Sequence, residues 1–411
     1  MSDILAQYGR VTIYNEPNHP SPIYHVEGTI EANPYGDLAA LLEDDSLEEV
    51  MYNGGTQCVK VAHRDHGMCR TNVWIDDNDG LQIATNIASF TNVPLGDGPG
   101  MVPIFDGRLP DGSRVNGTIP PVSPDGPTLT IRKFKEDPLT MIDLINFGTV
   151  NLRLAAMMWV WIEGLDARPA NFVIAGGTGS GKTTTLNCLG MYIPWHRRLL
   201  TVEDTAELQV YHDHWLRMET RRERPDGTPE VDMNDCLKSS LRMRPDRIIV
   251  GEVRGSEAAT LLTAMNTGHD GSFGSLHANT AQETVTRMIN PPMSVPPIML
   301  TGLDLIIIQA RLHVHGRTAR KITEVAEVAG MEGDKPRLNA IWKYDAARDE
   351  IVETGIPSQF RERICNAAGV TPEVFEEHVQ QRMAILADLQ RRDIRDIQTV
   401  TSIIQNFYAT R

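Results

Sequence analysis

The chain has 411 residues, enough for two to three domains of ~150 residues each. It is 41% hydrophobic and 23% charged, as ordinary globular proteins are, which excludes a disordered, collagen-like or fibrous chain. Its 39 lysines and arginines against 54 aspartates and glutamates give a net charge of −15. That balance argues against non-specific nucleic-acid binding as the main activity.

The sequence predicts neither a membrane span nor a signal peptide. No apolar run approaches the ~20 residues of a spanning helix, and the first residues lack a basic start followed by an apolar block. The five cysteines, an odd number with scattered spacing, are typical of reduced thiols. We therefore expect a cytoplasmic chain that reaches a membrane only through partners.

In chain order, the first expected domain is a mixed α+β domain over 1–135. Residues 37–50 have helical spacing, and residues 51–135 look β-like. Pro-Asp-Gly turn signals at 110–112 and 124–126 separate short runs that are typical of hairpin strands.

A linker over 136–150, which includes a short helix, leads to an α/β domain over 151–355. Its first helix carries Trp159 and Trp161, which are two residues apart and cannot share one helix face. We expect Trp159 in the core and Trp161 at a domain or subunit contact. Apolar strands then alternate with helices, which predicts a parallel sheet, and a helical segment over 356–411 follows.

Residues 176–183, Gly-Gly-Thr-Gly-Ser-Gly-Lys-Thr, match the phosphate-loop pattern G-x-x-x-x-G-K-[ST]. Glycines let backbone N–H groups point at phosphate oxygens, and the following helix N-terminus adds positive potential. The pattern follows an apolar strand and opens a helix, so a flexible glycine-rich turn is the weaker alternative. The residues expected to bind nucleotide are Gly177, Thr178, Gly179, Ser180, Gly181, Lys182, Thr183 and Thr184.

Two carboxylates, Glu203 and Glu252, follow the predicted strands 199–202 and 247–250. Hydrolysis of a nucleoside triphosphate needs a partner for Mg²⁺ and a residue that positions or deprotonates water. Strand carboxyl ends at the nucleotide edge of a parallel sheet are where such groups lie. Carboxylates end many strands simply because they prefer water, but their order behind a phosphate loop favours a function.

The polar segment 269–279 contains His269 and His277. Either could sense phosphate, although spacing alone favours two ordinary loop histidines. Most surface arginines are solvated, although one or two near a shared phosphate could act as fingers. The arginines that cluster in this region are Arg242, Arg244, Arg247 and Arg254.

The phosphate loop, VEDTAEL at 202–208, LRMRPDRIIVGEVRG at 241–255 and NTGHDGSFGSLHANT at 266–280 together resemble the secretion ATPase superfamily. Its members drive type II and type IV secretion, type IV pili and archaella. The resemblance, dense over about 170–290, implies an α/β fold: a RecA-like P-loop core, an N-terminal mixed α+β (PAS-like) domain and a small helical C-terminal appendage. It also implies a homohexamer that uses ATP and Mg²⁺.

The resemblance implies a role for each matching residue. Lys182 and Thr183 are the Walker A pair, and Thr183 with Glu252, the Walker B carboxylate, holds Mg²⁺. Glu203 is the catalytic glutamate that orients water. Arg254 lies in the tail of the Walker B motif.

Further matches concern histidines and arginines. His277, with His269 as a second candidate, falls in the family's histidine motif. In the family, ATP lies between the N-terminal and RecA-like domains, and the N-terminal domain supplies arginines to the phosphates. The corresponding candidates in this chain are Arg108, Arg114 and Arg132.

Residues 290–309 and the tail around 391–396 look similar to archaeal members, while the phosphate loop is also similar to the Tad-pilus branch. This implies a hexameric ATPase that powers assembly or rotation of an archaeal type IV pilus-like filament. It would act through a polytopic membrane platform protein at the inner face of the cell membrane, without a nucleic-acid partner. The alternatives are a RecA-like nucleic-acid translocase, a DNA-transfer (type IV secretion) ATPase or a nucleotide-gated scaffold.

Four residues have the types and spacing of metal ligands: Cys58, His63, His66 and Cys69. The segments 59–63 and 68–75 are typical of two strands, in which the donors alternate between faces and need not converge. We therefore favour a plain hairpin over a zinc site.

Overall fold

The computed structural model describes residues 3–17, 19–30, 33–91, 93–134, 138–223, 227–314, 317–333 and 335–410. The chain divides into two compact units, one of Met1–Glu136 with Arg224–Thr228, the other of Asp137–Glu223 with Pro229–Arg411. The predicted boundary between 135 and 136 lies outside the described residues.

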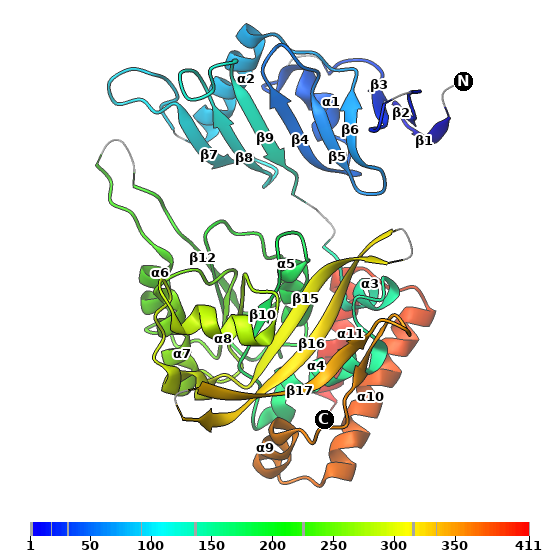
Figure 1. The fold of residues 1–411 in the computed structure, drawn as a ribbon, viewed down its shortest axis with the longest axis vertical. Helices are drawn as coiled ribbons and strands as arrows, with labels where there is room; N and C mark the ends of the chain where they lie inside the picture. The colour runs from blue at the N-terminus through cyan, green and yellow to red at the C-terminus, as the bar shows by residue number, and fades with distance from the viewer. Residues whose placement is uncertain are drawn as a thin grey trace. The chain divides into compact units, whose positions relative to one another are not determined.

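Within the described part of the first unit, nine strands form a sheet of order β1-β2-β3-β6-β5-β4-β9-β8-β7 (Figure 1). The strands are β1 (Ile4–Tyr8), β2 (Val11–Tyr14), β3 (Ile23–Val26), β4 (Leu47–Asn53), β5 (Lys60–His63), β6 (Gly67–Thr71), β7 (Ile104–Arg108), β8 (Arg114–Thr118) and β9 (Thr128–Arg132). The helices are η1 (Gly36–Leu38), α1 (Ala39–Leu42) and α2 (Asp77–Phe90).

The expected helix over 37–50 is wrong in its second half. The helix ends at Leu42, and β4 pairs antiparallel with both β5 and β9. Burial of Leu47, Val50 and Tyr52 on one face of the sheet outweighs the local helical spacing. Helix α2 was missed within the β-like stretch, although Asp76 caps it by accepting hydrogen bonds from the second and third backbone N–H groups of the helix.

The sheet of the second unit, in its described residues, has the order β12-β11-β13-β14-β10-β15-β16-β17-β18. The strands from β12 through β11, β13, β14 and β10 to β15 pair in parallel with their neighbours in the sheet. The strands β15, β16, β17 and β18 pair antiparallel. The strands are β10 (Phe172–Ala175), β11 (Leu199–Glu203), β12 (Trp215–Glu219), β13 (Arg247–Val250), β14 (Phe273–Leu276), β15 (Leu305–Val314), β16 (Arg317–Glu332), β17 (Lys335–Asp345) and β18 (Glu350–Glu353). The predicted parallel α/β core is confirmed.

Helices cover both faces of this sheet. They are α3 (Met141–Asn146), α4 (Leu152–Glu163), η2 (Gly164–Asp166), α5 (Lys182–Gly190), α6 (Met233–Ser240), α7 (Glu257–Asn266), α8 (Ala281–Ile289), η3 (Pro297–Gly302), α9 (Gln359–Ala368), α10 (Pro372–Arg391) and α11 (Ile397–Ala409). In β10, Phe172 and Ile174 pack with α3, α4, α5 and α9 to α11, whereas Val173 and Ala175 pack with α6, α7 and α8. Successive residues of a strand face opposite sides of the sheet. Because helices cover both sides of this sheet, β10 needs an uninterrupted run of apolar residues.

Helix α4 is buried on all sides, between the sheet and α10 (Figure 1). The expectation that Trp161 lies at a domain or subunit contact is wrong, because it is 3% exposed within the same core as Trp159. The opposite sides of α4 are both covered because the C-terminal helices pack onto it. Arg382 of α10 donates to Glu163 at the end of α4, and both side chains are fully buried.

Candidate nucleotide site

The parallel strands bring the predicted site residues to one edge of the sheet. Glu203 ends β11, Glu252 follows β13 by two residues, and His277 directly follows β14. The phosphate loop follows β10, which lies beside β14. Since these strands run in parallel, their carboxyl ends meet, and residues about 100 positions apart lie together.

The phosphate loop forms the turn between β10 and α5, with Gly179 and Gly181 at φ of +71° and +92°. The Lys182 ammonium donates to the carbonyl oxygens of Gly176 at 2.9 Å and Gly177 at 3.2 Å. Burial lowers the pKa of Lys182, and the charge of Glu252 opposes that effect. The lysine therefore already lies within the loop, where phosphate oxygens would replace carbonyls as its acceptors.

Glu203 is 3% exposed, and one of its carboxylate oxygens is held by backbone. Oε1 accepts hydrogen bonds from the N–H groups of Glu207 at 2.9 Å and Leu208 at 3.0 Å. Oε2 is buried and has no hydrogen-bond partner among the described residues. Burial raises the pKa of Glu203 from 4.5 to about 7, against these two hydrogen bonds. A carboxyl with this pKa and one free oxygen is suited to accepting a proton from water near neutral pH.

A glycine is needed beside this carboxylate. A Cβ on Gly251 would lie 2.9 Å from Cγ of Glu203. The backbone of Gly251 also donates to the carbonyl of Val202 at 2.9 Å, as the sheet continues to its edge. The close approach allows Glu203 and Glu252 to occupy neighbouring strand ends.

Glu252 is held between two nitrogen-containing side chains. Nε2 of His277 lies 2.7 Å from its Oε1, and Arg254 donates to its Oε2. Arg254 also donates to Asp204 at 3.1 Å and is 64% exposed. Burial and the nearby charge of Lys182 lower the pKa of His277. The lowered pKa favours the neutral form of His277, and the exposed Arg254 supplies a long cationic side chain at this edge.

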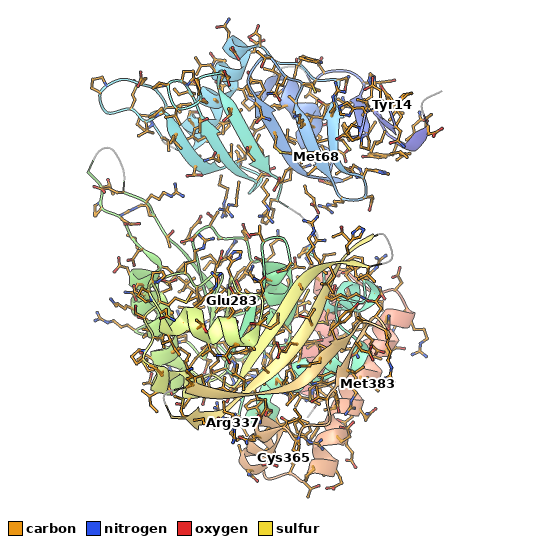
Figure 2. All side chains as sticks on the ribbon, viewed as in Figure 1. Tyr14, Met68, Glu283, Arg337, Cys365 and Met383 are labelled. Carbon is orange, nitrogen blue, oxygen red and sulfur yellow. The ribbon has the colours of Figure 1, made fainter. Side chains whose placement is uncertain are left out.

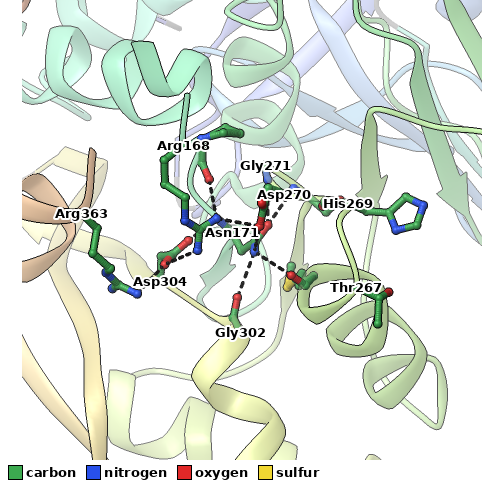
Figure 3. Close-up of polar contacts among 12 residues, drawn as sticks. Arg168, Asn171, Thr267, His269, Asp270, Gly271, Gly302, Asp304 and Arg363 are labelled. Atoms are coloured by element: carbon green, nitrogen blue, oxygen red, sulfur yellow. Dashed lines mark hydrogen bonds and ion pairs between the residues drawn. The ribbon is translucent and has the colours of Figure 1, made fainter. Parts of the chain in front are cut away.

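The structure separates the two histidines. His269 precedes β14, on the amino-terminal edge of the sheet, and the four residues of β14 rise by ~13 Å before His277. Figure 3 shows the His269 ring pointing away from the contacts between Asn171 and Asp304. At this edge Asp304 pairs with Arg168 and Arg363, and the Asn171 amide oxygen accepts from the Gly271 N–H at 2.8 Å.

Three of the four clustered arginines are also at the amino-terminal edge, since Arg242 and Arg244 precede β13 and Arg247 is its first residue. Arg247 is 6% exposed and donates to the carbonyl of Asp270 at 2.8 Å, while Arg242 and Arg244 are exposed. Arg254, beyond the strand's other end, is the member that lies beside Glu252. The topology of one short strand therefore divides the cluster.

The three candidate arginines of the first unit form one cross-strand row. Arg108 pairs with Arg114, Arg114 with Arg132, and Arg132 with Glu49, in the register of β7, β8, β9 and β4. Residues directly opposite each other share a face, and this face is opposite to the buried Val115. Such a row of guanidinium groups is suited to an anion.

The hairpin prediction for the cysteine and histidine pattern is confirmed, since β5 and β6 pair antiparallel. The ring nitrogens of His63 contact the Tyr8 hydroxyl and the N–H groups of Asp65 and His66. Among the described residues no group of three or more His, Cys, Asp or Glu side chains is arranged to hold a metal ion.

Two residues of β15 and β16, Gln309 and Arg320, also lie at the phosphate loop, and no sequence motif indicated them. Gln309 is 1% exposed and accepts from the Thr185 hydroxyl at 2.8 Å. Arg320 donates to the Gly179 carbonyl at 3.0 Å. They lie well over 100 residues from the loop in sequence, so only the strand order could have indicated them.

The residues present fit a nucleotide triphosphate with Mg²⁺. The loop supplies backbone N–H groups and the Lys182 ammonium, and Thr183 at the start of α5 supplies a hydroxyl. The unpartnered Oε2 of Glu203 is a buried acceptor at the same edge.

No described helix is both long and apolar enough to cross a membrane.

Known proteins are similar to this chain over most of its length. The family of type II/IV secretion system proteins matches residues 100–397. An uncharacterized protein of Methanocaldococcus jannaschii is 32% identical over 90% of this chain and 75% of its own length. A putative conjugal transfer protein of Mycobacterium tuberculosis is 32% identical over 74% of this chain and 88% of its own.

Among solved structures, the X-ray structure of the Legionella pneumophila ATPase DotB matches with a TM-score of 0.50 and 17% identity. The match covers 92% of this chain and 98% of that chain, so the two share a fold. The fold is thus that of this ATPase. On the match over 100–397, the chain belongs to the type II/IV secretion system protein family.

Proposed function

We propose that the chain is a Mg²⁺-dependent ATP hydrolase. The observation that carries the proposal is the buried Glu203, with a pKa of about 7 and a free Oε2, at the sheet edge that bears the phosphate loop. Glu203 positions the attacking water and accepts its proton. Lys182 and the backbone of residues 177–184 bind the phosphates.

The other site residues have distinct roles in this proposal. Thr183 and Glu252 would hold Mg²⁺, which would supply positive charge against the phosphates when bound. His277 fixes the orientation of Glu252 through the 2.7 Å contact. Arg254, exposed and next to Glu252, stabilises negative charge that develops on the transferred phosphoryl group. The cross-strand row of the first unit, Arg108, Arg114 and Arg132, binds phosphate from the N-terminal domain.

At the level of the assembly, we infer a homohexamer that acts on a polytopic membrane platform protein from the cytoplasmic side. Its ATP-driven domain motions assemble or rotate an archaeal type IV pilus-like filament. The similarity to a protein of Methanocaldococcus jannaschii over 90% of the chain supports an archaeal branch. The two compact units supply the parts that such motion requires.

A second candidate is a DNA-transfer ATPase of the type IV secretion class. The similarity to a putative conjugal transfer protein over 88% of that protein favours it. The net charge of −15 argues against direct DNA binding. Stimulation of ATP turnover by DNA would favour the second candidate, and stimulation by a platform-protein fragment the first.

The test is ATP turnover as a function of protein concentration, with and without a cytoplasmic fragment of the platform protein. We expect specific activity to rise with concentration and with the fragment. Glu203→Gln should remove turnover, while Glu377→Gln, an exposed glutamate of α10, should leave it unchanged. Activity that is independent of Glu203 would refute the assigned role, and activity flat with concentration would refute a site shared between subunits.

A further inference from the structure

The antiparallel pair β15 and β16 lies beside the phosphate loop. β15 is the parallel neighbour of β10, the strand that leads into the loop, and β16 returns alongside it. The register pairs Arg311 directly with Arg320. Directly opposed residues in neighbouring strands project from the same face, so the two guanidinium groups start side by side.

Both arginines reach the loop. Nε of Arg320 donates to the carbonyl oxygen of Gly179 at 3.0 Å. A Cβ on Gly179 would lie 3.8 Å from Nη1 of Arg311. A Cβ on Gly181 would lie 3.2 Å from Cδ of Arg320 and 3.0 Å from Nε2 of Gln309. The strand pair thus lies against the loop at its two left-handed glycines.

The hydrogen bond from Arg320 has a consequence for the inside of the loop. A peptide unit is planar, so holding the Gly179 carbonyl fixes the whole peptide between residues 179 and 180. This peptide belongs to the turn whose N–H groups form the phosphate nest. The loop must keep this shape for its N–H groups to converge on one anion.

The charges of the pair add to this effect. Both side chains are exposed, and among the described residues no carboxylate lies within ion-pair distance of Arg311 or Arg320. Two uncompensated positive charges therefore lie at the loop that receives the phosphates. Their field adds to the positive potential at the N-terminus of α5.

We propose that Arg320 is a positioning residue of the phosphate loop, and that Arg311 beside it raises the loop's affinity for anionic phosphate. The strand pair β15 and β16 is then a third side of the nucleotide site, besides the phosphate loop and the edge that carries the two carboxylates. The inference rests on the proposed nucleotide site. It concerns binding, so it predicts a change in affinity for ATP and ADP rather than in the chemical step.

The experiment compares Arg320→Ala, Arg320→Lys and Arg311→Ala in the full chain. The matched control is Arg337→Ala, because Arg337 (Figure 2) is an exposed arginine of β17 that likewise donates to a backbone carbonyl, that of Ala329 at 3.1 Å. Equilibrium binding of ADP, KM and kcat for ATP, and thermal unfolding are measured for each variant.

We expect Arg320→Ala to raise the Kd for ADP and the KM for ATP by about tenfold, as for loss of one hydrogen bond from a charged donor. The change in kcat should be smaller than about threefold. Arg320→Lys restores the charge and recovers part of the affinity, but not the fixed geometry of the guanidinium. Arg311→Ala should raise Kd by a few-fold and weaken its dependence on salt. Arg337→Ala should match the wild type.

Unchanged ADP affinity in Arg320→Ala would overturn the inference, as would an equal loss in the control variant. A lowered unfolding temperature that accounts for the loss would make Arg320 merely structural and also overturn it. If the wild type binds ADP but hydrolyses no ATP, the proposed function fails while the binding comparison still decides the inference. A wild type that binds neither nucleotide would refute both.

Discussion

Replacement of Glu203 by glutamine should abolish turnover and stabilise the protein at the same time. The amide keeps an oxygen that can accept the hydrogen bonds from the N–H groups of Glu207 and Leu208. It has the shape of the protonated acid and no titrating group. The variant therefore removes the pH-dependent cost of burying a carboxylate while leaving the packing in place.

The magnitude follows from the pKa. Burial raises the pKa of Glu203 from 4.5 to about 7, and each pKa unit corresponds to about 1.4 kcal/mol. Between these two values the folded state binds more protons than the unfolded state, so the free energy of unfolding falls as pH rises. Relative to pH values below 4.5, the free energy of unfolding of the wild type is lower by about 2 kcal/mol at pH 6 and by about 3 kcal/mol at pH 8.

Urea unfolding of the wild type and Glu203→Gln at pH 6 and pH 8 measures this difference. We expect the free energy of unfolding of the variant to exceed that of the wild type at both pH values, and by about 1 kcal/mol more at pH 8 than at pH 6. In the wild type, kcat/KM for ATP should rise about tenfold per pH unit below pH 7 and level off above it, since the ionised carboxylate is the base.

A stability difference between the variant and the wild type that is equal at both pH values would refute the reasoning, because Glu203 would then not titrate in this range. A variant that is less stable at both values would show that the amide, and not the charge, disrupts the site. Retained turnover would separate the residue from catalysis whatever the stability shows.

Three further outcomes test the placement of residues. His277→Asn should lower ATP turnover about tenfold, as for loss of a residue that orients a metal ligand. His269→Asn should not lower it, because His269 is at the opposite edge of the sheet, and equal effects would contradict this. Thr183→Ala should raise the Mg²⁺ concentration for half-maximal turnover several-fold, and an unchanged Mg²⁺ dependence would remove it from the metal site. Arg382→Met should lower the free energy of unfolding by about 3–5 kcal/mol, since it removes the guanidinium that pairs with the fully buried Glu163 carboxylate. Chemical denaturation at neutral pH measures this, and a loss below about 1 kcal/mol would show that the pair contributes little.

The parts of the site that local sequence encodes were the predictable ones. A phosphate loop is a backbone conformation of eight consecutive residues, so its glycines, Lys182 and Thr183 could be identified without knowing the sheet. Glu203 and Glu252 could be placed because each follows an apolar strand, and the carboxyl ends of parallel strands converge.

The rest depends on which strands are neighbours. His269 and His277 are eight residues apart, and their spacing alone did not distinguish them, although the family resemblance favoured His277. A four-residue strand places them at opposite edges. Gln309 and Arg320 carry no motif, and they reach the loop because β15 pairs with β10 and β16 with β15. Strand order is a property of the whole sheet, so spacing along the chain could not reveal these contacts.

The surroundings of the two carboxylates give the proposed division of labour its physical basis. Glu203 is buried, bonded by backbone through one oxygen, and has a raised pKa, so it can take a proton. Glu252 lies between the guanidinium of Arg254 and the His277 ring, and these two contacts orient its carboxylate for the proposed metal site. Gly251 follows β13 and has no side chain to push Glu203 of β11 away, so these two different environments are adjacent. Two neighbouring carboxyls with such different contacts can take different roles at one bound nucleotide: Glu203 as the base, through its unpartnered Oε2, and Glu252 as the proposed metal ligand.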